Sequence, residues 1–254
     1  MKTNLFWTLI HKEWTEQLRS GRLVILLAVF LFFGISSPLI AKFIPDILQS
    51  LMKGQNIILH IPAATWQDAI AQFVKNLSQM GLFVVILLSM GTVAKEKENG
   101  TASFLLVKPV SRNLFILSKF SAQLLVLFVS ISLGFLAMVF YTKVFFGTFP
   151  MIAFVESTLV LFLYLTVVQF VTILFSVLMK TQIVAGLLAF VTSFIISGVS
   201  MLGKPGLFSP GHLLDEIQTC LNGSLMDWKP FAGAFIILLC CVGISLRYFR
   251  NWEN

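Results

Sequence analysis

Six long apolar runs divide the chain, with polar segments between them. They cover about residues 23–41, 78–94, 120–141, 151–179, 183–202 and 231–247. Each run approaches the roughly 20 apolar residues that an α-helix needs to cross the hydrocarbon core of a bilayer. A spanning β-strand would instead alternate polar and apolar positions over about ten residues, whereas these runs are apolar on all sides. The pattern therefore predicts an all-α integral membrane protein whose six transmembrane helices occupy residues 23–247.

The composition supports this class. Of 254 residues, 57% are hydrophobic and only 11% are charged, and the mean hydropathy is +0.92. So few charges would not cover the surface of a soluble domain, and a chain with so much to bury is not disordered. The three cysteines have neither the spacing of a disulfide framework nor that of a metal site. The net charge is +7. In a membrane protein the distribution of Lys and Arg along the chain indicates its orientation, and we expect no nucleic-acid partner.

The cations are distributed unequally between the loops on the two sides of the membrane. One side holds six, namely Lys42, Lys53, Lys75, Lys143, Lys204 and Lys229, and the other side holds the remaining two thirds of the 18 Lys and Arg residues. Cytoplasmic loops carry the excess of Lys and Arg. We therefore expect both termini and the segment 95–119 in the cytoplasm, and a short cytoplasmic tail at 248–254.

The first 22 residues predict an amphipathic helix. Phe6, Ile10, Trp14 and Leu18 recur at intervals of four, while polar residues occupy the opposite side. Such a helix can lie in the headgroup plane as an interfacial elbow before the first span. The alternative is a cytoplasmic helix packed on the base of the protein itself.

Two longer segments, 42–77 and 203–230, are predicted to be outer loops. Within the first, Thr65 and Asp68 have the form of a capping box, and apolar residues at helical spacing follow as far as Leu77. We expect this short amphipathic helix to rest on the outer leaflet or to cap the spans.

The inner loop 95–119 carries the clearest candidate chemistry. Gly100 can end one helix in a left-handed conformation, Thr101 can cap a new one, and Pro109 can stop it. Ser111 can then cap the helix that becomes the third span. The short helix between would expose the apolar residues Phe104, Leu105 and Leu106 on a cytoplasmic loop, which indicates a docking surface. The alternative, a tight connection, would not need Leu105 and Leu106.

These residues resemble a known family. The run Glu96-Lys97-Glu98-Asn99-Gly100-Thr101, then Leu105-Leu106 and Pro109-Val110-Ser111-Arg112, is similar to the signature of ABC-2 type transporter permeases. An amphipathic start with Lys12-Glu13, six spans, and Ser209-Pro210 in the last outer loop agree with it. The resemblance covers essentially the whole chain.

The resemblance implies a permease subunit, most simply of an exporter in a bacterial plasma membrane. Its partners would be a separate cytoplasmic ATPase subunit in two copies, a second permease as homodimer or heterodimer, and the lipid bilayer. The implied ATPase-docking residues are Glu96, Glu98, Gly100, Thr101, Phe104, Leu105, Leu106, Pro109 and Arg112.

The chain itself is expected to bind no cofactor and to hydrolyse no ATP, because ATP and Mg²⁺ would lie on the partner. Gly198, Gly203 and Lys204 approach a phosphate-binding loop, but Pro205 stands where Ser or Thr must hold Mg²⁺.

Other functions stay open. An ion-coupled secondary carrier would place ionisable groups near the midplane, and these runs are nearly free of charge. Glu156 and Gln169 are the candidate substrate contacts, although Glu156 lies near the outer end of its run and Gln169 is also suited to interhelical hydrogen bonding. A membrane-embedded immunity or sensor protein is a further alternative. An intramembrane enzyme is disfavoured because no histidine falls inside a span.

Overall fold

The computed structural model describes residues 2–52, 64–100, 111–200, 202 and 204–250, and these residues form helices and short connections without any strand. The first half of the chain contains α1 (Lys2–Arg19), α2 (Arg22–Met52), α3 (Trp66–Asn76), the π-helix η2 (Leu77–Gly81), α4 (Leu82–Ser89), α5 (Ala94–Glu98) and α7 (Arg112–Phe146). The second half contains α8 (Met151–Leu178), α9 (Gln182–Val199), the 3₁₀ turns η3 (Lys204–Phe208) and η4 (Pro210–His212), α10 (Leu213–Leu221) and α11 (Lys229–Arg250).

The prediction of an all-α membrane protein with six spans is confirmed. The helices long and apolar enough to cross a membrane are Arg22–Pro45, Trp66–Glu98, Arg112–Phe146, Met151–Leu178, Gln182–Val199 and Lys229–Arg250. Several helices extend beyond the apolar runs that revealed them. α2 continues to Met52 through Pro38 and Pro45, so the start of the segment expected to be an outer loop is helical.

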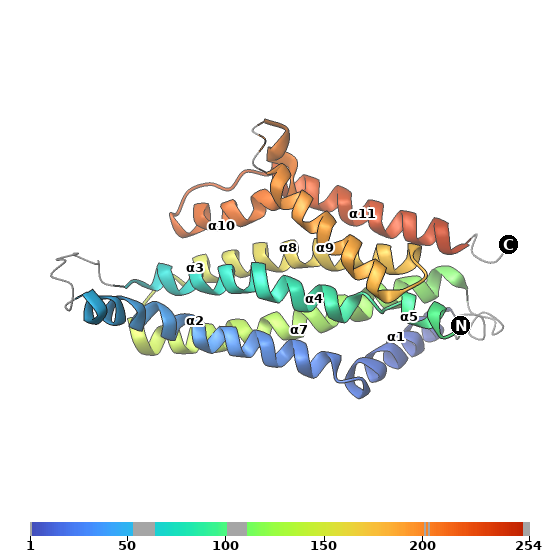
Figure 1. The fold of residues 1–254 in the computed structure, drawn as a ribbon, viewed down its shortest axis with the longest axis horizontal. Coiled ribbons are helices and arrows are strands. Elements are labelled where there is room, and N and C mark those ends of the chain that lie inside the picture. The colour runs from blue at the N-terminus through green and yellow to red at the C-terminus, as the bar shows by residue number, and fades with distance from the viewer. Residues whose placement is uncertain (1, 53–63, 101–110, 201, 203, 251–254) are drawn as a thin grey trace.

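The second span is a composite helix. α3, η2 and α4 follow one another without a break. The Asp68 carboxylate accepts a hydrogen bond from the Thr65 backbone N–H at 2.7 Å, as the capping box predicts. However, Ile70 and Phe73 are each only 1% exposed, because neighbouring helices cover the apolar face of α3 (Figure 1). Protein therefore covers the apolar face of residues 66–76, which favours the alternative in which this helix packs on the spans.

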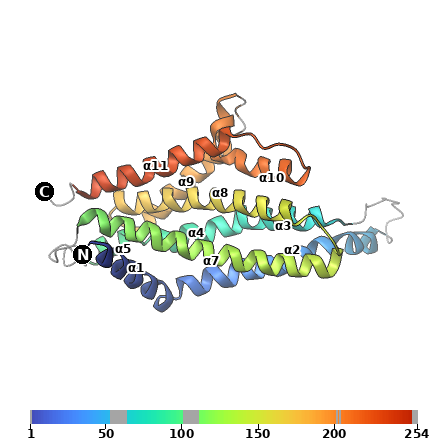
Figure 2. The ribbon, with the colours of Figure 1, turned by 180° about the vertical axis from the view of Figure 1, so that it is seen from behind.

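α8 is the centre of the bundle. Within its most apolar window 78% of residues are buried, whereas the corresponding share is 22% for α9. α8 contacts α4, α7, α9, α10 and α11, and the views from both sides show it between α11 and the α2–α7 layer (Figures 1 and 2). α9 thus has a broad apolar face with no cover from the described residues.

α2 and α7 cross closely at two glycines. A Cβ on Gly34 would lie 2.3 Å from the carbonyl oxygen of Gly134, and one on Gly134 would lie 2.8 Å from that of Phe30. Small residues allow this approach, which is how membrane helices gain packing contacts without a hydrophobic driving force.

α1 and the C-terminal end of α11 lie at the same end of the bundle, which we call the terminal end (Figures 1 and 2). The opposite end, which includes α10, is called the distal end. Gly21 has φ +71°, in the left-handed region that favours glycine, and turns the chain from α1 into α2.

Candidate functional site

Four charged side chains meet at the terminal end, and we call them the inner polar cluster: Lys12, Glu13, Glu96 and Lys119. The Lys119 ammonium lies 3.0 Å from a Glu13 carboxylate oxygen and 2.8 Å from one of Glu96. Lys12 lies 3.1 Å from the other Glu13 oxygen. The cluster therefore joins α1, α5 and α7, three elements that lie far apart in the sequence.

Lys119 is the centre of this cluster. Its side chain is 1% exposed, and its ammonium lies 5.0 Å from the centre of the Phe115 ring. The sequence predicts that Lys119 ends the inner loop 95–119. In the structure α7 begins at Arg112, so Lys119 lies inside this helix. A buried lysine needs countercharges, and Glu13 and Glu96 supply them.

Glu13 keeps its charge because two ammonium groups contact it. Burial by itself raises the pKa of the Glu13 carboxyl, but the ammonium groups of Lys119 and Lys12 outweigh burial and hold that pKa below its ordinary value. Carboxylate oxygens of Glu13, Glu16 and Glu96 come within 4.8 Å of one another. The Lys119 ammonium contacts two of these carboxylates, Glu13 and Glu96.

A second polar layer lies one helical turn further along α7. The Gln123 amide donates to the Thr92 hydroxyl at 3.0 Å, and the Gln169 amide donates to the Gln123 backbone carbonyl at 3.1 Å. All three side chains are buried. Gln169 is thus an interhelical hydrogen-bonding group, which ties α8 to α7.

The span that leads into the inner loop breaks just before α5, and α8 stabilises the break. The Ser176 hydroxyl accepts hydrogen bonds from the backbone N–H groups of Val93 and Ala94, both at 2.9 Å. The Lys97 ammonium donates to the Val177 carbonyl and lies 5.4 Å from the centre of the Tyr248 ring. α5 is therefore fixed against α8 and α11 as well as α7.

Only some of the predicted docking residues lie in the part of the chain that the structure describes. Gly100 has φ +68°, and Ser111 accepts a hydrogen bond from the Leu114 N–H at 3.4 Å, so the expected helix end and helix cap are confirmed. Glu98 is exposed, and the Arg112 guanidinium donates to the Arg250 carbonyl at 2.9 Å. The remaining docking residues, Thr101, Phe104, Leu105, Leu106 and Pro109, lie outside the described residues.

The predicted interfacial residues of α1 do not share one environment. Phe6, Ile10 and Trp14 are half-buried, and Trp14 packs against the core, whereas Leu18 is 45% exposed. The most buried side chains of α1 are the polar Glu13 and Gln17. α1 therefore packs on the bundle through a polar face, and a location in the headgroup plane remains a prediction.

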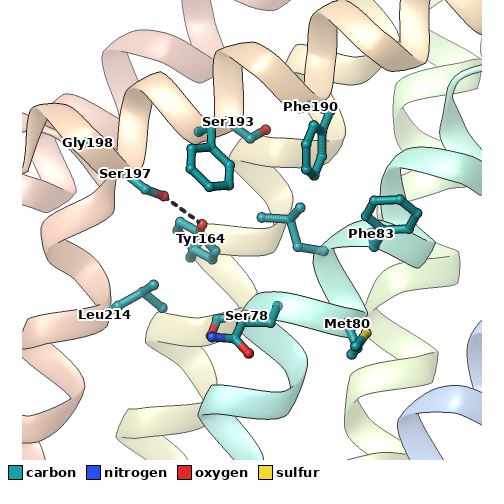
Figure 3. A pocket seen from close by; sticks show the side chains of 12 residues that line it. Ser78, Met80, Phe83, Tyr164, Phe190, Ser193, Ser197, Gly198 and Leu214 are labelled. Atoms are coloured by element: carbon teal, nitrogen blue, oxygen red, sulfur yellow. Dashed lines mark hydrogen bonds between the residues drawn. The ribbon is translucent and has the colours of Figure 1, made fainter.

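Near the distal end, residues of η2, α4, α8 and α9 line an open groove of about 640 Å³, which we call the distal groove. Its walls are mostly apolar, with Phe83, Phe190 and Phe194 among them. Its polar groups include the Tyr164 and Ser197 hydroxyls, which are hydrogen-bonded at 3.3 Å (Figure 3). A second apolar groove, of about 430 Å³ and lined in part by Met90 and Gly186, lies further along α4 and α9.

The two predicted substrate contacts do not line these grooves. Glu156 is half-buried in the second turn of α8, and Gln169 is engaged with Gln123. The groove residues are apolar or carry single hydroxyls, so in the sequence they look like ordinary span residues. The π-helix η2, which places Ser78 beside the groove, likewise has no recognisable sequence signal.

Six apolar spans, five of them packed around the central helix α8, and a charged base at one end define a multi-span α-helical membrane protein. A model of the ABC-2 family transporter protein matches residues 7–249, and the chain belongs to this family. It is similar to the "Uncharacterized transmembrane protein YxlG" of Bacillus subtilis (strain 168), with 26% identity over 138 residues. That match spans 53% of each chain, so about half the length of the relative is covered.

Proposed function

We propose that this permease is the membrane half of an exporter, driven by a separate cytoplasmic ATPase that docks on the segment 95–119. The observation that carries the proposal is the inner polar cluster. Because α5 and α7 enter and leave the segment 101–110, and Lys119 joins both to α1, a force on this segment would reach three elements at once. Switching between access states needs differential contacts of this kind.

Family membership implies association with an ATPase subunit in general. We propose that two ATPase copies serve two permease halves, with the second half a copy of this chain or a sister permease. ATP and Mg²⁺ are then bound by the ATPase, and this chain hydrolyses nothing itself. The terminal end faces the cytoplasm of a bacterial cell, and α1 lies at the inner interface of the plasma membrane.

The distal groove supports a substrate of amphiphilic character. Its Phe side chains offer apolar contact, and the hydroxyls of Ser78, Ser193 and Ser197 offer a few hydrogen-bonding groups. A mostly apolar pocket with a few convergent polar groups is the usual form of a ligand site. We propose that the groove forms one wall of the substrate path.

The secondary carrier is the main alternative, and the buried charges bear on it. Ion coupling uses ionisable groups that exchange an ion near the midplane. Here Lys119 and its two carboxylates lie at the terminal end and are bonded to one another. This arrangement favours a structural joint over an ion-exchange site.

The test is co-purification of the tagged chain in mild detergent with a co-expressed ABC ATPase from the same operon. We expect a stoichiometric complex with the unchanged chain. The double variant Leu105→Asp/Leu106→Asp should insert normally but lose the ATPase. Leu225→Asp is the matched control, because Leu225 is 98% exposed in the connection between α10 and α11, and it should keep the complex.

The outcomes separate the proposals. Unchanged association of the double variant would contradict docking on this segment. Repeated failure of the unchanged chain to retain any ATPase would favour the secondary carrier, or an immunity or sensor role.

A further inference from the structure

A basic notch lies at the terminal end, on the side of α11 that faces the start of α7. It has a volume of about 480 Å³ and is lined by Asn113, Gly243, Leu246, Arg247 and Arg250. None of these residues belongs to the inner polar cluster or to the distal groove. The notch is therefore a separate feature of the bundle.

The sequence of α11 creates this shape. Gly243, Arg247 and Arg250 recur at spacings of four and three, so they lie on one face of the helix. A Cβ added to Gly243 would meet no atom within 4 Å, so the missing side chain leaves open space in the notch that Gly243 lines with the two arginines. Leu246 adds an apolar wall beside it.

The notch is electropositive. Within the part of the chain that the structure describes, no carboxylate forms a salt bridge with Arg247 or Arg250. Arg112 adjoins them, because its guanidinium donates to the Arg250 carbonyl at 2.9 Å. Asn113 lies in the first turn of α7, where the helix dipole also favours an anion.

The position of the notch selects the kind of anion. Arg247 and Arg250 form the last turn of a membrane-spanning helix, and arginines at such ends extend to the level of the lipid headgroups. Basic pockets between transmembrane helices at this level suit anionic headgroups. Gly243 and Leu246 continue the notch toward the apolar part of the span, where an acyl chain would lie.

We propose that this notch binds an anionic phospholipid, with the phosphate between Arg247 and Arg250 and the start of an acyl chain over Gly243. The arginines would bind the phosphate group. We infer that this phosphate belongs to a membrane lipid because the notch has an apolar wall next to its basic wall. The lipid then bridges α7 and α11 at the terminal end.

The test is native mass spectrometry of the delipidated full-length chain titrated with phosphatidylglycerol. Phosphatidylcholine and inorganic phosphate serve as separate probes. We expect the chain to retain phosphatidylglycerol at concentrations where neither other probe binds. Arg247→Gln/Arg250→Gln should weaken the binding about 25-fold, since each cation near an anionic headgroup contributes about fivefold. Gly243→Leu should weaken it as well, by filling the space for the chain.

The matched control is Arg19→Gln/Lys180→Gln, which removes two exposed cations from the same end but outside the notch. It should bind phosphatidylglycerol like the unchanged chain. An equal loss of phosphatidylglycerol binding in the control would show that the lipid is attracted by the overall positive charge of this end, and would overturn the proposed binding site. The proposal that the ligand is a lipid would be overturned if Gly243→Leu bound phosphatidylglycerol fully. It would also be overturned if inorganic phosphate bound as well as phosphatidylglycerol. Thermal unfolding of each variant checks that the loss of binding is not a loss of fold.

Discussion

Replacing Lys119 with methionine tests whether the inner polar cluster holds the terminal end together. Methionine keeps the length and the apolar stem of lysine but removes the ammonium group. Glu13 and Glu96 would then face each other without the cation that both contact. Glu13 would retain Lys12, whose side chain is 42% exposed and therefore screened by solvent.

The magnitude follows from the geometry. The carboxylate oxygens lie within 4.8 Å of each other, and two unit charges at that separation repel by about 3.5 kcal/mol at an effective dielectric constant of about 20. Removing one partner of a buried ion pair typically costs about 3–5 kcal/mol. Because Lys12 offsets part of the repulsion, we expect Lys119→Met to lower the free energy of unfolding by about 3 kcal/mol.

The contribution of Glu13 to stability depends on pH with opposite signs in the two proteins. In the unchanged chain the pKa of Glu13 is lowered from 4.5, so its contribution is present above about pH 4.5 and is lost as the pH falls through the lowered value. Without Lys119, only Lys12 opposes the effect of burial, which raises the pKa of Glu13, so we expect that pKa to rise in the folded variant. The contribution of Glu13 to stability should then fall in the variant as the pH rises through that raised pKa, whereas in the unchanged chain the contribution of Glu13 should not fall.

Reversible unfolding in mixed detergent micelles, followed by fluorescence between pH 5 and pH 8, measures both effects. The double variant Glu13→Gln/Lys119→Met should recover more than half of the loss, because it removes the repulsion. Lys12→Met should cost less than about 1 kcal/mol, as exposed pairs do. If Lys119→Met lowered the free energy of unfolding by less than about 1 kcal/mol, or had the same pH profile as the unchanged chain, the inner polar cluster would not hold the terminal end together.

Three further predictions test the packing and the orientation. Gly34→Val should destabilise the fold by about 1–3 kcal/mol in the same unfolding assay, since even its Cβ would lie 2.3 Å from the Gly134 carbonyl oxygen. Ser176→Ala should cost about 1–3 kcal/mol, because two buried N–H groups lose their acceptor. Cysteine placed at Leu225 should react with an impermeant maleimide added to whole cells, and cysteine placed at Asn113 should react only after the cells are opened.

Each of these has a direct control. Gly243→Ala should leave stability within about 0.5 kcal/mol, because its Cβ meets no atom, and an equal loss there would contradict the crossing argument. Ser176→Thr keeps the hydroxyl and should retain most of the stability. The labelling uses a background with Cys220, Cys240 and Cys241 replaced by alanine, and the reverse labelling pattern would invert the proposed orientation.

The spans were predictable because crossing a bilayer imposes a length and a composition that a single sequence displays. Helix ends were less so, because α2 continues past Pro45 where hydropathy falls. The helix around Phe73 shows a second limit. Its amphipathic face was evident, but whether lipid or protein covers that face depends on neighbours distant in the sequence.

The inner polar cluster shows why the site was only half predictable. Glu96 could be singled out from the local pattern of the inner loop. Its contact with Lys119 spans 23 residues, and that between Lys119 and Glu13 spans 106, so no local pattern links the three. The available signal was a lysine between Phe115 and Phe120 in a helical apolar pattern, a position at which an unpaired cation is costly.

The polar groups of the bundle are graded along its length, and this bears on how it could move. Ions join three elements at the terminal end, then amides join α7 and α8 through Gln123 and Gln169. Near the distal groove, by contrast, α9 is held by apolar contacts and by two hydroxyl hydrogen bonds, Tyr164 with Ser197 and Ser209 to the Ile196 carbonyl. Apolar contacts between membrane helices exchange readily for lipid contacts, whereas buried ion pairs do not. A force applied at the terminal end would therefore move α1, α5 and α7 together and open or close the bundle along α4 and α9.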